Sequence, residues 1–256
     1  MRIKNYWLFL VIVTAILLVS FPVFSQEKES PSKELDFTVG INAAYHRAAI
    51  TLGDKKIPGS LDYSFLALQV DVDLNEYLTL GVLGGYNSNA FKDPVDFAQL
   101  PLPLRVDDQH FKSMMFGMRA KSDFLSWKDF SLAAQAELLF FKRFQKDIPF
   151  QPPVPSNSAL AKNSFNQAAI ELHFQYDGFT GFTLFAGPRL NLIHGNTSIQ
   201  ETVGIVTGAE TLSYKQKRLL GVVCGIYYEL GDHFDLNAAI TLFSQTSISV
   251  SLFYIF

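Results

Sequence analysis

Ten segments of the chain after residue 25 alternate large apolar residues with small or polar ones, and the apolar face of each segment carries no charge. Successive side chains of a β-strand point to opposite faces of the sheet, so each segment predicts a strand with one uncharged face. No apolar run after residue 25 approaches the roughly 18 residues that a membrane-spanning helix needs. If the mature chain enters a membrane, it must therefore do so as strands. The predicted strands cover residues 37–45, 66–72, 78–86, 114–120, 132–140, 168–176, 182–192, 220–228, 234–242 and 248–256.

The opposite faces of these segments are polar. Apolar outward faces and polar inward faces are typical of a transmembrane β-barrel and are the reverse of a soluble β-sandwich. The sequence predicts an all-β fold: an up-and-down antiparallel transmembrane β-barrel of ten strands. Eight strands are the alternative if residues 36–47 or the last hairpin are assigned differently. The charged and histidine residues of the inner faces are Asp71, Arg119, Lys121, Glu137, Glu171, Arg189, Glu229 and Asp235, with His46 and His173.

The N-terminus predicts export from the cytoplasm. Arg2 and Lys4 precede an apolar stretch, and small residues stand three and one positions before Gln26, as a signal peptidase requires. An uncleaved membrane anchor is the alternative, because the apolar stretch is nearly long enough to span. The predicted organisation is a signal peptide over residues 1–25, a periplasmic leader over 26–35 and the barrel over 36–256.

The C-terminus predicts insertion into an outer membrane. The last segment ends on Tyr254 and Phe256 and resembles the closing strand of bacterial outer-membrane barrels, whose terminal aromatic residue is read by the barrel-assembly machinery. Terminal residues of soluble domains usually fray into water, where apolar side chains favour aggregation. We therefore expect a bacterial outer-membrane protein, a monomer, whose partners are membrane lipid and, through Tyr254 and Phe256, the assembly machinery.

The connections between the predicted strands alternate in length. Short periplasmic turns and long extracellular loops are typical of these barrels, so the alternation predicts that both termini are periplasmic. Residues 244–246 form a short fifth connection on the loop side. The short connections are residues 75–76, 123–129, 177–179 and 231–233, and the long ones are residues 48–62, 88–110, 145–163 and 194–212.

Five inward-facing residues predict a charge network inside the barrel: Arg119, Glu137, Glu171, His173 and Arg189. Buried charges persist when they are paired. One hypothesis is a salt-bridged plug, since a barrel of about eight strands has just enough room for side chains. The alternative is a gate or a narrow path for ions or small solutes.

Pro188 stands in the middle of a predicted strand. Proline lacks the N–H that a strand inside a closed barrel needs. We therefore expect a β-bulge at this position, which leaves the facing of Arg189 open.

The long loops contain a candidate interaction patch for a protein partner: Phe97, Leu100, Leu102 and Leu104. Exposed apolar residues often mark interaction sites. The alternative is that the loop folds down over the barrel mouth and buries them.

The sequence favours a non-enzymatic role over a hydrolase. Asp108-Gln109-His110 has the Asp-x-His spacing of the omptin family of outer-membrane proteases, but Asp71 and Asp73 fall at the wrong end of their strand to complete that site. No catalytic, cofactor or metal site is predicted, because the five histidines are spread one per region. The single cysteine excludes an internal disulfide, and the net charge of −3 gives no indication of nucleic-acid binding.

The chain resembles the PorT-like family of small outer-membrane β-barrel proteins. The resemblance lies in Leu184-Phe185-Ala186-Gly187-Pro188-Arg189-Leu190, which is similar to that family's Ala-Gly-Pro strand, and in the pattern from Leu220 to Leu230 followed by a turn and a last strand ending on Phe256. It implies the fold and the outer-membrane location, and for some members an accessory role in secretion or gliding. With the residues above, it leads us to expect a structural, adhesion or interaction protein, or an accessory of an envelope secretion assembly.

Overall fold

The computed structural model describes residues 36–75, 77–106, 110–142, 145–148 and 157–256. The predicted signal peptide and leader lie outside the described residues. None of the described residues forms a helix long and apolar enough to cross a membrane. The chain consists of the strands β1 (Asp36–Leu52), β2 (Ile57–Asn75), β3 (Leu78–Phe91), β4 (Val95–Phe97), β5 (Leu104–Val106), β6 (Phe111–Trp127), β7 (Phe130–Lys142), β8 (Gln145–Ile148), β9 (Asn157–Phe179), β10 (Phe182–Val203), β11 (Val206–Gln216), β12 (Leu220–Glu229), β13 (Phe234–Leu242) and β14 (Gln245–Ile255).

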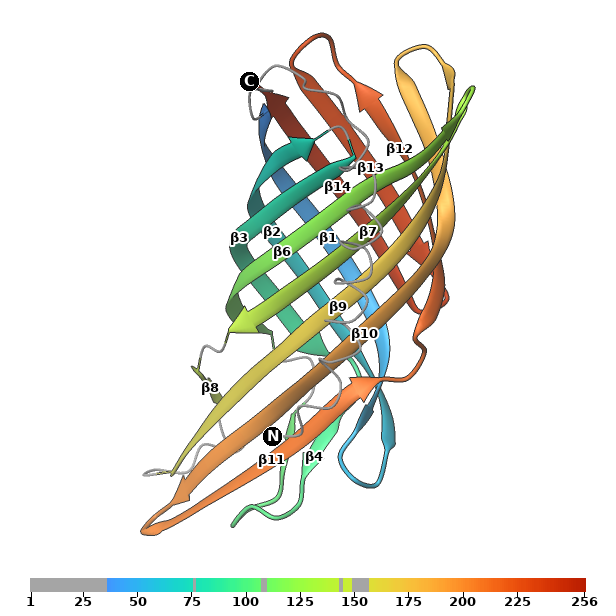
Figure 1. Cartoon of the computed structure of the whole chain (residues 1–256). Helices are drawn as coiled ribbons and strands as arrows, with labels where there is room; N and C mark the ends of the chain where they lie inside the picture. The colour runs from blue at the N-terminus through green and yellow to red at the C-terminus, as the bar shows by residue number, and fades with distance from the viewer. Residues whose placement is uncertain (1–35, 76, 107–109, 143–144, 149–156) are drawn as a thin grey trace.

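Ten of these strands close into an antiparallel, up-and-down barrel (Figure 1). Around the ring the order is β1, β2, β3, β6, β7, β9, β10, β12, β13 and β14, and β14 pairs with β1 to close it. The N–H of Phe256 donates to the carbonyl of Phe37, so the first strand begins and the chain ends at the same end of the barrel. The fold is that of an outer-membrane β-barrel, as the alternation predicted, and ten strands rather than eight is correct.

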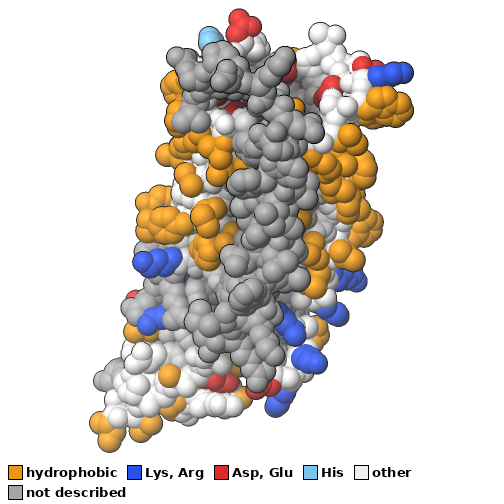
Figure 2. All heavy atoms as spheres, viewed as in Figure 1, with side chains coloured by type: hydrophobic (Ala, Val, Ile, Leu, Met, Phe, Trp, Pro, Cys, Tyr) orange, Lys and Arg blue, Asp and Glu red, His pale blue; other side chains and the backbone are white. Residues whose placement is uncertain are grey.

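The outward faces of the ten strands form an apolar belt, which is visible around the wall in Figure 2. Along β1, for example, Phe37, Ile41 and Tyr45 are exposed. Asn42 and His46, which belong to the opposite face of the same strand, are buried. The predicted facing is confirmed along the ten strands, except that two residues expected on outward faces, Leu78 and Ala136, are buried. Because a shift of one residue would turn every charged side chain into the lipid, this pattern fixes the register of the sheet.

The strands on the loop side continue well beyond the belt. The residues predicted as loops at 48–62 and 194–212 are largely β-hairpins, because the flanking strands keep pairing up to Leu52 with Ile57 and up to Val203 with Val206. On the opposite side, β6 continues to Trp127, so the prediction that residues 123–129 form the connection is wrong. The turn there is Lys128-Asp129 only, and Lys128 adopts a positive φ of 52°.

The wall narrows on the loop side. Strands β12, β13 and β14 are short. Beyond their loop-side ends, the single strand β11 takes their place in the wall and pairs with both β10 and β1. The N–H of Gly53 donates to the carbonyl of Ser213, and the N–H of Lys217 to the carbonyl of Ala49, which fastens β11 to the first hairpin. A barrel with fewer strands has a narrower interior, so the loop end of the lumen is easier to fill with side chains.

The expected bulge at Pro188 is wrong. Pro188 pairs in register with Val222 of β12, and the register between β10 and β9 is the same on both sides of it. The irregularity of β10 lies instead between Phe182 and Leu184. Arg189 therefore points into the barrel, where it is buried.

Gly187, the neighbour of Pro188, allows β9 to approach closely. A Cβ atom at this position would collide with the carbonyl oxygen of Leu172. We expect Gly187→Ala to destabilise the barrel by about 1–3 kcal/mol, the usual cost of overpacking. The measurement is denaturant-induced unfolding of the mature protein in detergent micelles. Gly84→Ala is the matched control, since a Cβ there meets no atom within 4 Å; equal stability of the two variants would contradict the prediction.

Candidate functional site: the barrel interior

The charged residues of the lumen centre on Glu171 of β9. Arg189 of β10 lies directly opposite Glu171 in the sheet, and its Nη1 donates to Oε1 of that carboxylate. Nε2 of His173 lies 2.6 Å from the other carboxylate oxygen. All three side chains are almost completely buried. Both oxygens of the carboxylate are therefore occupied, as a buried ion pair requires.

His173 is held in place on its other side by aromatic residues. Its Nδ1 lies 3.5 Å from the hydroxyl of Tyr227 on β12, and its ring stacks on Phe185 at 4.6 Å between centroids. Phe185 stacks in turn on Tyr227 at 4.7 Å. The imidazole is thus a packed member of the network with no open side facing a substrate space.

Arg119 belongs to a second cluster. Its Nη2 lies 2.5 Å from Oδ2 of Asp71 on β2, although Glu137 is its direct neighbour on β7. Asp71, Gly81 and Arg119 occupy one row across β2, β3 and β6. Since Gly81 has no side chain, Arg119 can reach across β3 to Asp71. The predicted five-residue network is therefore divided, and within the described part of the chain Glu137 makes no hydrogen bond or ion pair.

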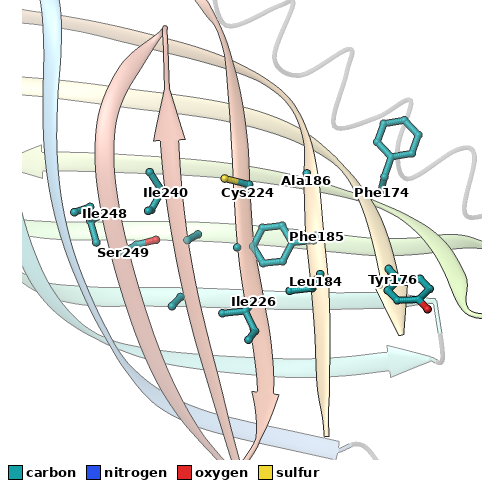
Figure 3. Close-up of a pocket in the computed structure, with 13 residues that line it drawn as sticks. Phe174, Tyr176, Leu184, Phe185, Ala186, Cys224, Ile226, Ile240, Ile248 and Ser249 are labelled. Carbon is teal, nitrogen blue, oxygen red and sulfur yellow. The ribbon is translucent and has the colours of Figure 1, made fainter. Parts of the chain in front are cut away.

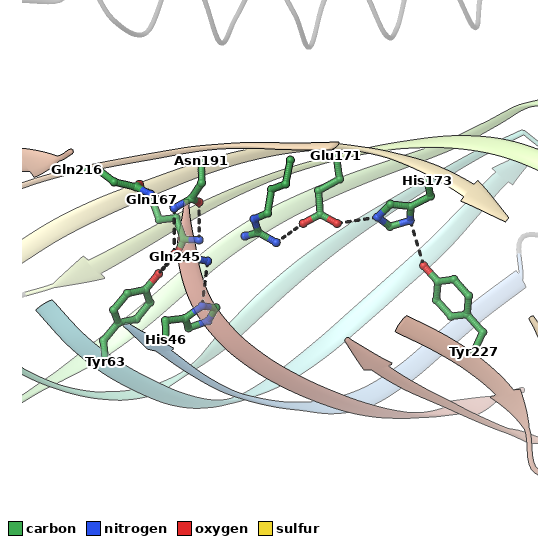
Figure 4. Close-up of polar contacts among 10 residues, drawn as sticks. His46, Tyr63, Gln167, Glu171, His173, Asn191, Gln216, Tyr227 and Gln245 are labelled. Atoms are coloured by element: carbon green, nitrogen blue, oxygen red, sulfur yellow. Dashed lines mark hydrogen bonds and ion pairs between the residues drawn. The ribbon is translucent and has the colours of Figure 1, made fainter. Parts of the chain in front are cut away.

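Next to the charged clusters, towards the loop side, lies a layer of amide side chains (Figure 4). Asn191 of β10 donates to Gln245 of β14 at 3.0 Å and to Gln216 of β11 at 2.8 Å. Gln245 contacts Nδ1 of His46 at 3.1 Å, and Asn191 accepts a hydrogen bond from Gln167 at 2.9 Å. These side chains come from strands on both sides of the ring, so the layer crosses the lumen from wall to wall.

An aromatic layer follows. Tyr63 of β2 donates to Gln167 at 2.7 Å and packs edge-on against Phe165 at 5.2 Å between centroids. Phe165 stacks on Phe141 at 4.1 Å, and further on Phe91 packs edge-on against Tyr214. These side chains belong to one continuous buried cluster that also contains Ile50, Leu61, Phe111, Met115 and Leu139.

The segment from β4 to β5 closes the mouth. Its residues Phe97 and Leu100 are 1% and 5% exposed and belong to the same buried cluster, whereas Leu102 is 39% exposed and Leu104 is partly buried. Of the two hypotheses for this loop, the burial of Phe97 and Leu100 fits the loop folded over the mouth. The four predicted residues therefore do not form one exposed patch, because only Leu102 among them is exposed.

Two buried carboxylates fasten this lid to the hairpin of β10 and β11. The backbone N–H of Gln99 donates to Glu210 at 2.8 Å, and that of Leu102 donates to Glu201 at 2.9 Å. Pro101 packs against Gly208, where a Cβ atom would meet the proline ring. The role of Glu201 and Glu210 was not predicted from the sequence. The feature that could have indicated it is the presence of two acids at inward positions of one hairpin, with no basic residue placed to pair with them.

The wall also has a groove on its outer face (Figure 3). It has a volume of 680 Å³ and is almost entirely apolar. Small outward residues such as Ala186, Cys224 and Ala238 leave it hollow between larger neighbours. Because these residues belong to the apolar belt, the groove faces the hydrocarbon of the membrane and not the lumen.

The described residues hold no cluster of metal ligands. No group of three or more His, Cys, Asp or Glu in the described ranges could hold a metal ion. Asp108 of the omptin-like spacing lies outside the described residues, so its geometry with His110 is not addressed. Asp71 is occupied by Arg119 inside the barrel.

The chain matches no family model and no curated protein. Among solved structures it is similar to the outer membrane protease OmpT from Escherichia coli, with 11% identity, 91% of this chain and 100% of that chain covered, and a TM-score of 0.49. It is also similar to the β domain of the Bordetella autotransporter BrkA (10% identity, coverage 87% and 100%, TM-score 0.44). A third is the outer membrane protein AlkL (10% identity, coverage 90% and 97%, TM-score 0.42). These proteins differ in activity, and at such identities the likeness is one of fold alone.

Proposed function

We propose that this protein is a non-enzymatic outer-membrane β-barrel whose lumen is a structural plug. Its loop-side head, which consists of the hairpin of β1 and β2, the hairpin of β10 and β11 and the segment from β4 to β5, acts as an adhesion or interaction surface. The observation that carries the proposal is the filling of the lumen. Charged, amide and aromatic layers follow one another along the axis, and the segment from β4 to β5 covers the last of them. Side chains thus occupy the lumen at each of these levels, which favours a plug over a substrate site or a solute path.

The location and orientation are part of the proposal. An apolar belt of strands, the start of β1 and the end of β14 on one side, and long hairpins on the other support an outer-membrane barrel with periplasmic termini and an extracellular head. Tyr254 and Phe256, exposed on the closing strand, are the proposed signal for the barrel-assembly machinery. We propose that the protein acts as a monomer.

The head exposes apolar residues that the membrane does not cover. Ile205 stands fully exposed at the tip of the hairpin between β10 and β11, and Val206 is 54% exposed beside it. Leu102 lies near this hairpin, where its N–H bonds to Glu201. Apolar residues at a protruding tip mark an interaction site for a protein partner.

The tip gives the experiment that tests the proposal. We expect Ile205→Ser/Val206→Ser to reduce adhesion of whole cells, or capture of the partner by cross-linking, at least about tenfold, as loss of interface anchors does. Ile57→Ser is the matched control, since Ile57 is also exposed at the start of a hairpin strand on the loop side. Heat-modifiable migration on gels verifies that both variants fold. Unchanged adhesion in the tip variant would contradict the proposal.

An accessory role in an envelope secretion assembly is a variant of the same proposal, since it also uses the head or the rim as a contact surface. A narrow channel is the second candidate, and the observation in its favour is the polar row formed by the charged and amide layers, which extends along the lumen as far as the aromatic layer. An omptin-like hydrolase finds no support in the described residues.

A further inference from the structure

Basic residues border the apolar belt on the loop side. On three strands the outward residue that follows the apolar face is a cation: Arg47 after Tyr45 on β1, Lys112 beyond Met114 on β6, and Lys142 after Phe140 on β7. On β11 and the segment after it, next to β1, Lys217 and Arg218 directly precede the exposed Leu219 and Leu220 of the belt, and Lys215 points outward two residues earlier. We call these six the basic rim: Arg47, Lys112, Lys142, Lys215, Lys217 and Arg218.

The opposite border of the belt has the opposite charge. The exposed or partly exposed charged residues there are mostly acidic. In the described part of the chain the bases that accompany them are Lys128, which is exposed, and Lys121, which is partly exposed and pairs with Asp123. Figure 2 shows several Lys and Arg side chains along the loop-side border of the belt on the visible face; acidic side chains are visible at both ends, with a basic side chain at the end opposite the loops. The acidic residues are Asp36, Asp73, Asp123, Asp129, Asp177, Glu229 and Asp232. If these charged residues served only to hydrate the two ends of the barrel, the two borders would not be expected to differ in the sign of their charge.

The basic side chains stand in groups. Lys215 lies opposite Thr51, and the N–H of Lys217 bonds to Ala49, so Arg47 is the diagonal outward neighbour of Lys217. Lys142 lies opposite Met114, which makes it a diagonal neighbour of Lys112. Diagonal neighbours on one face are about 7–8 Å apart, within reach of long side chains. Two such cations can therefore hold one phosphate group.

The cations are available for a ligand. Among the six residues of the basic rim, Arg47 forms an ion pair with a described residue: its Nη2 lies 2.9 Å from Oδ2 of Asp62. The other five make no ion pair with any described residue. Their positions against exposed apolar side chains place them at the level of lipid headgroups, and Lys and Arg near a membrane surface attract anionic lipid with about 1 kcal/mol each.

We propose that the basic rim binds the phosphate groups of an anionic lipid in the membrane leaflet on the loop side. The lipid tails lie along the apolar belt below the rim, and each phosphate sits between neighbouring cations. The proposal concerns the outer wall and is independent of what fills the lumen or contacts the head.

The test compares lipid binding by purified mature protein in non-ionic detergent. The probes are lipid A with two phosphates and the same lipid A without phosphates, and the readout is the affinity measured by native mass spectrometry. Wild-type protein is expected to bind the phosphorylated form at least about tenfold more tightly. Lys217→Gln/Arg218→Gln is expected to remove most of this preference, because about 1 kcal/mol is lost for each cation.

The control variant, Lys55→Gln/Lys56→Gln, removes the same charge at the hairpin tip between β1 and β2, away from the belt. It is expected to keep the wild-type preference. Lys112→Gln/Lys142→Gln examines the other group of the rim, and a reduced preference there supports the proposal. Equal binding of the two lipids by wild-type protein, equal losses in rim and control variants, or binding of inorganic phosphate as tight as that of the lipid would each overturn it.

Discussion

Replacement of Glu171 by leucine is expected to lower the free energy of unfolding by about 3–5 kcal/mol, because it leaves the guanidinium of Arg189 buried without a counter-charge. Glu171 and Arg189 are 6% and 8% exposed in their side chains, so water cannot take over the lost interaction. His173 loses its carboxylate partner in the same variant. The measurement is denaturant-induced unfolding in detergent micelles, followed by the fluorescence of Trp127, the one tryptophan after residue 25.

The double variant separates pairing from packing. Replacing a complete buried ion pair by apolar residues is often neutral or stabilising. We therefore expect Glu171→Leu/Arg189→Met to recover most of the loss. Glu229→Leu removes an exposed acid that forms no salt bridge with any described residue, and it serves as the control, with an expected change within about 0.5 kcal/mol. If the single variant Glu171→Leu were as stable as the control, the two charges would not form the pair that the structure shows.

The facing of the wall could be predicted from the sequence because a strand has a period of two and the lipid tolerates no charge on one face. The same alternation places Arg189 among the inward residues, but the bulge expected at Pro188 left its facing open until the structure showed it buried in the lumen. The expected bulge was wrong since the break in pairing at Gly187 and Pro188 is local: the register to β12 continues through it. Loop boundaries were less predictable, because strands beyond the membrane alternate without an apolar face to mark them.

The partners inside the lumen were harder to predict. The sequence placed Arg119 in one network with Glu137, Glu171, His173 and Arg189. In the structure Arg119 reaches past Gly81 to Asp71 instead, because Gly81 has no side chain to block the row between them. A glycine between two opposite charges in one row was the signal that could have indicated this pair. The amide layer joins His46 to Gln245, which are 199 residues apart, and only closure of the ring brings them together.

The electrical behaviour of the barrel distinguishes a plug from a gate. Mature protein reconstituted into planar bilayers is expected to show no stable open level, because the lumen is filled by side chains at several heights. Deleting residues 95–106 and joining the ends with a short Gly-Ser linker removes the lid but leaves the amide layer around Asn191 and the ion pair of Glu171 in place. This variant is therefore also expected to remain closed.

Each other outcome assigns a different function. A stable open level in the wild-type protein would replace the plug by the narrow channel, with the polar row as its path. Opening only after deletion of residues 95–106 would make the lid a gate and the amide layer a permeable filter, and then Glu201 and Glu210 would hold the gate shut through their bonds to Leu102 and Gln99. Closure in both proteins leaves the outer surface of the barrel, its head and its rim, as the only part that can carry the function.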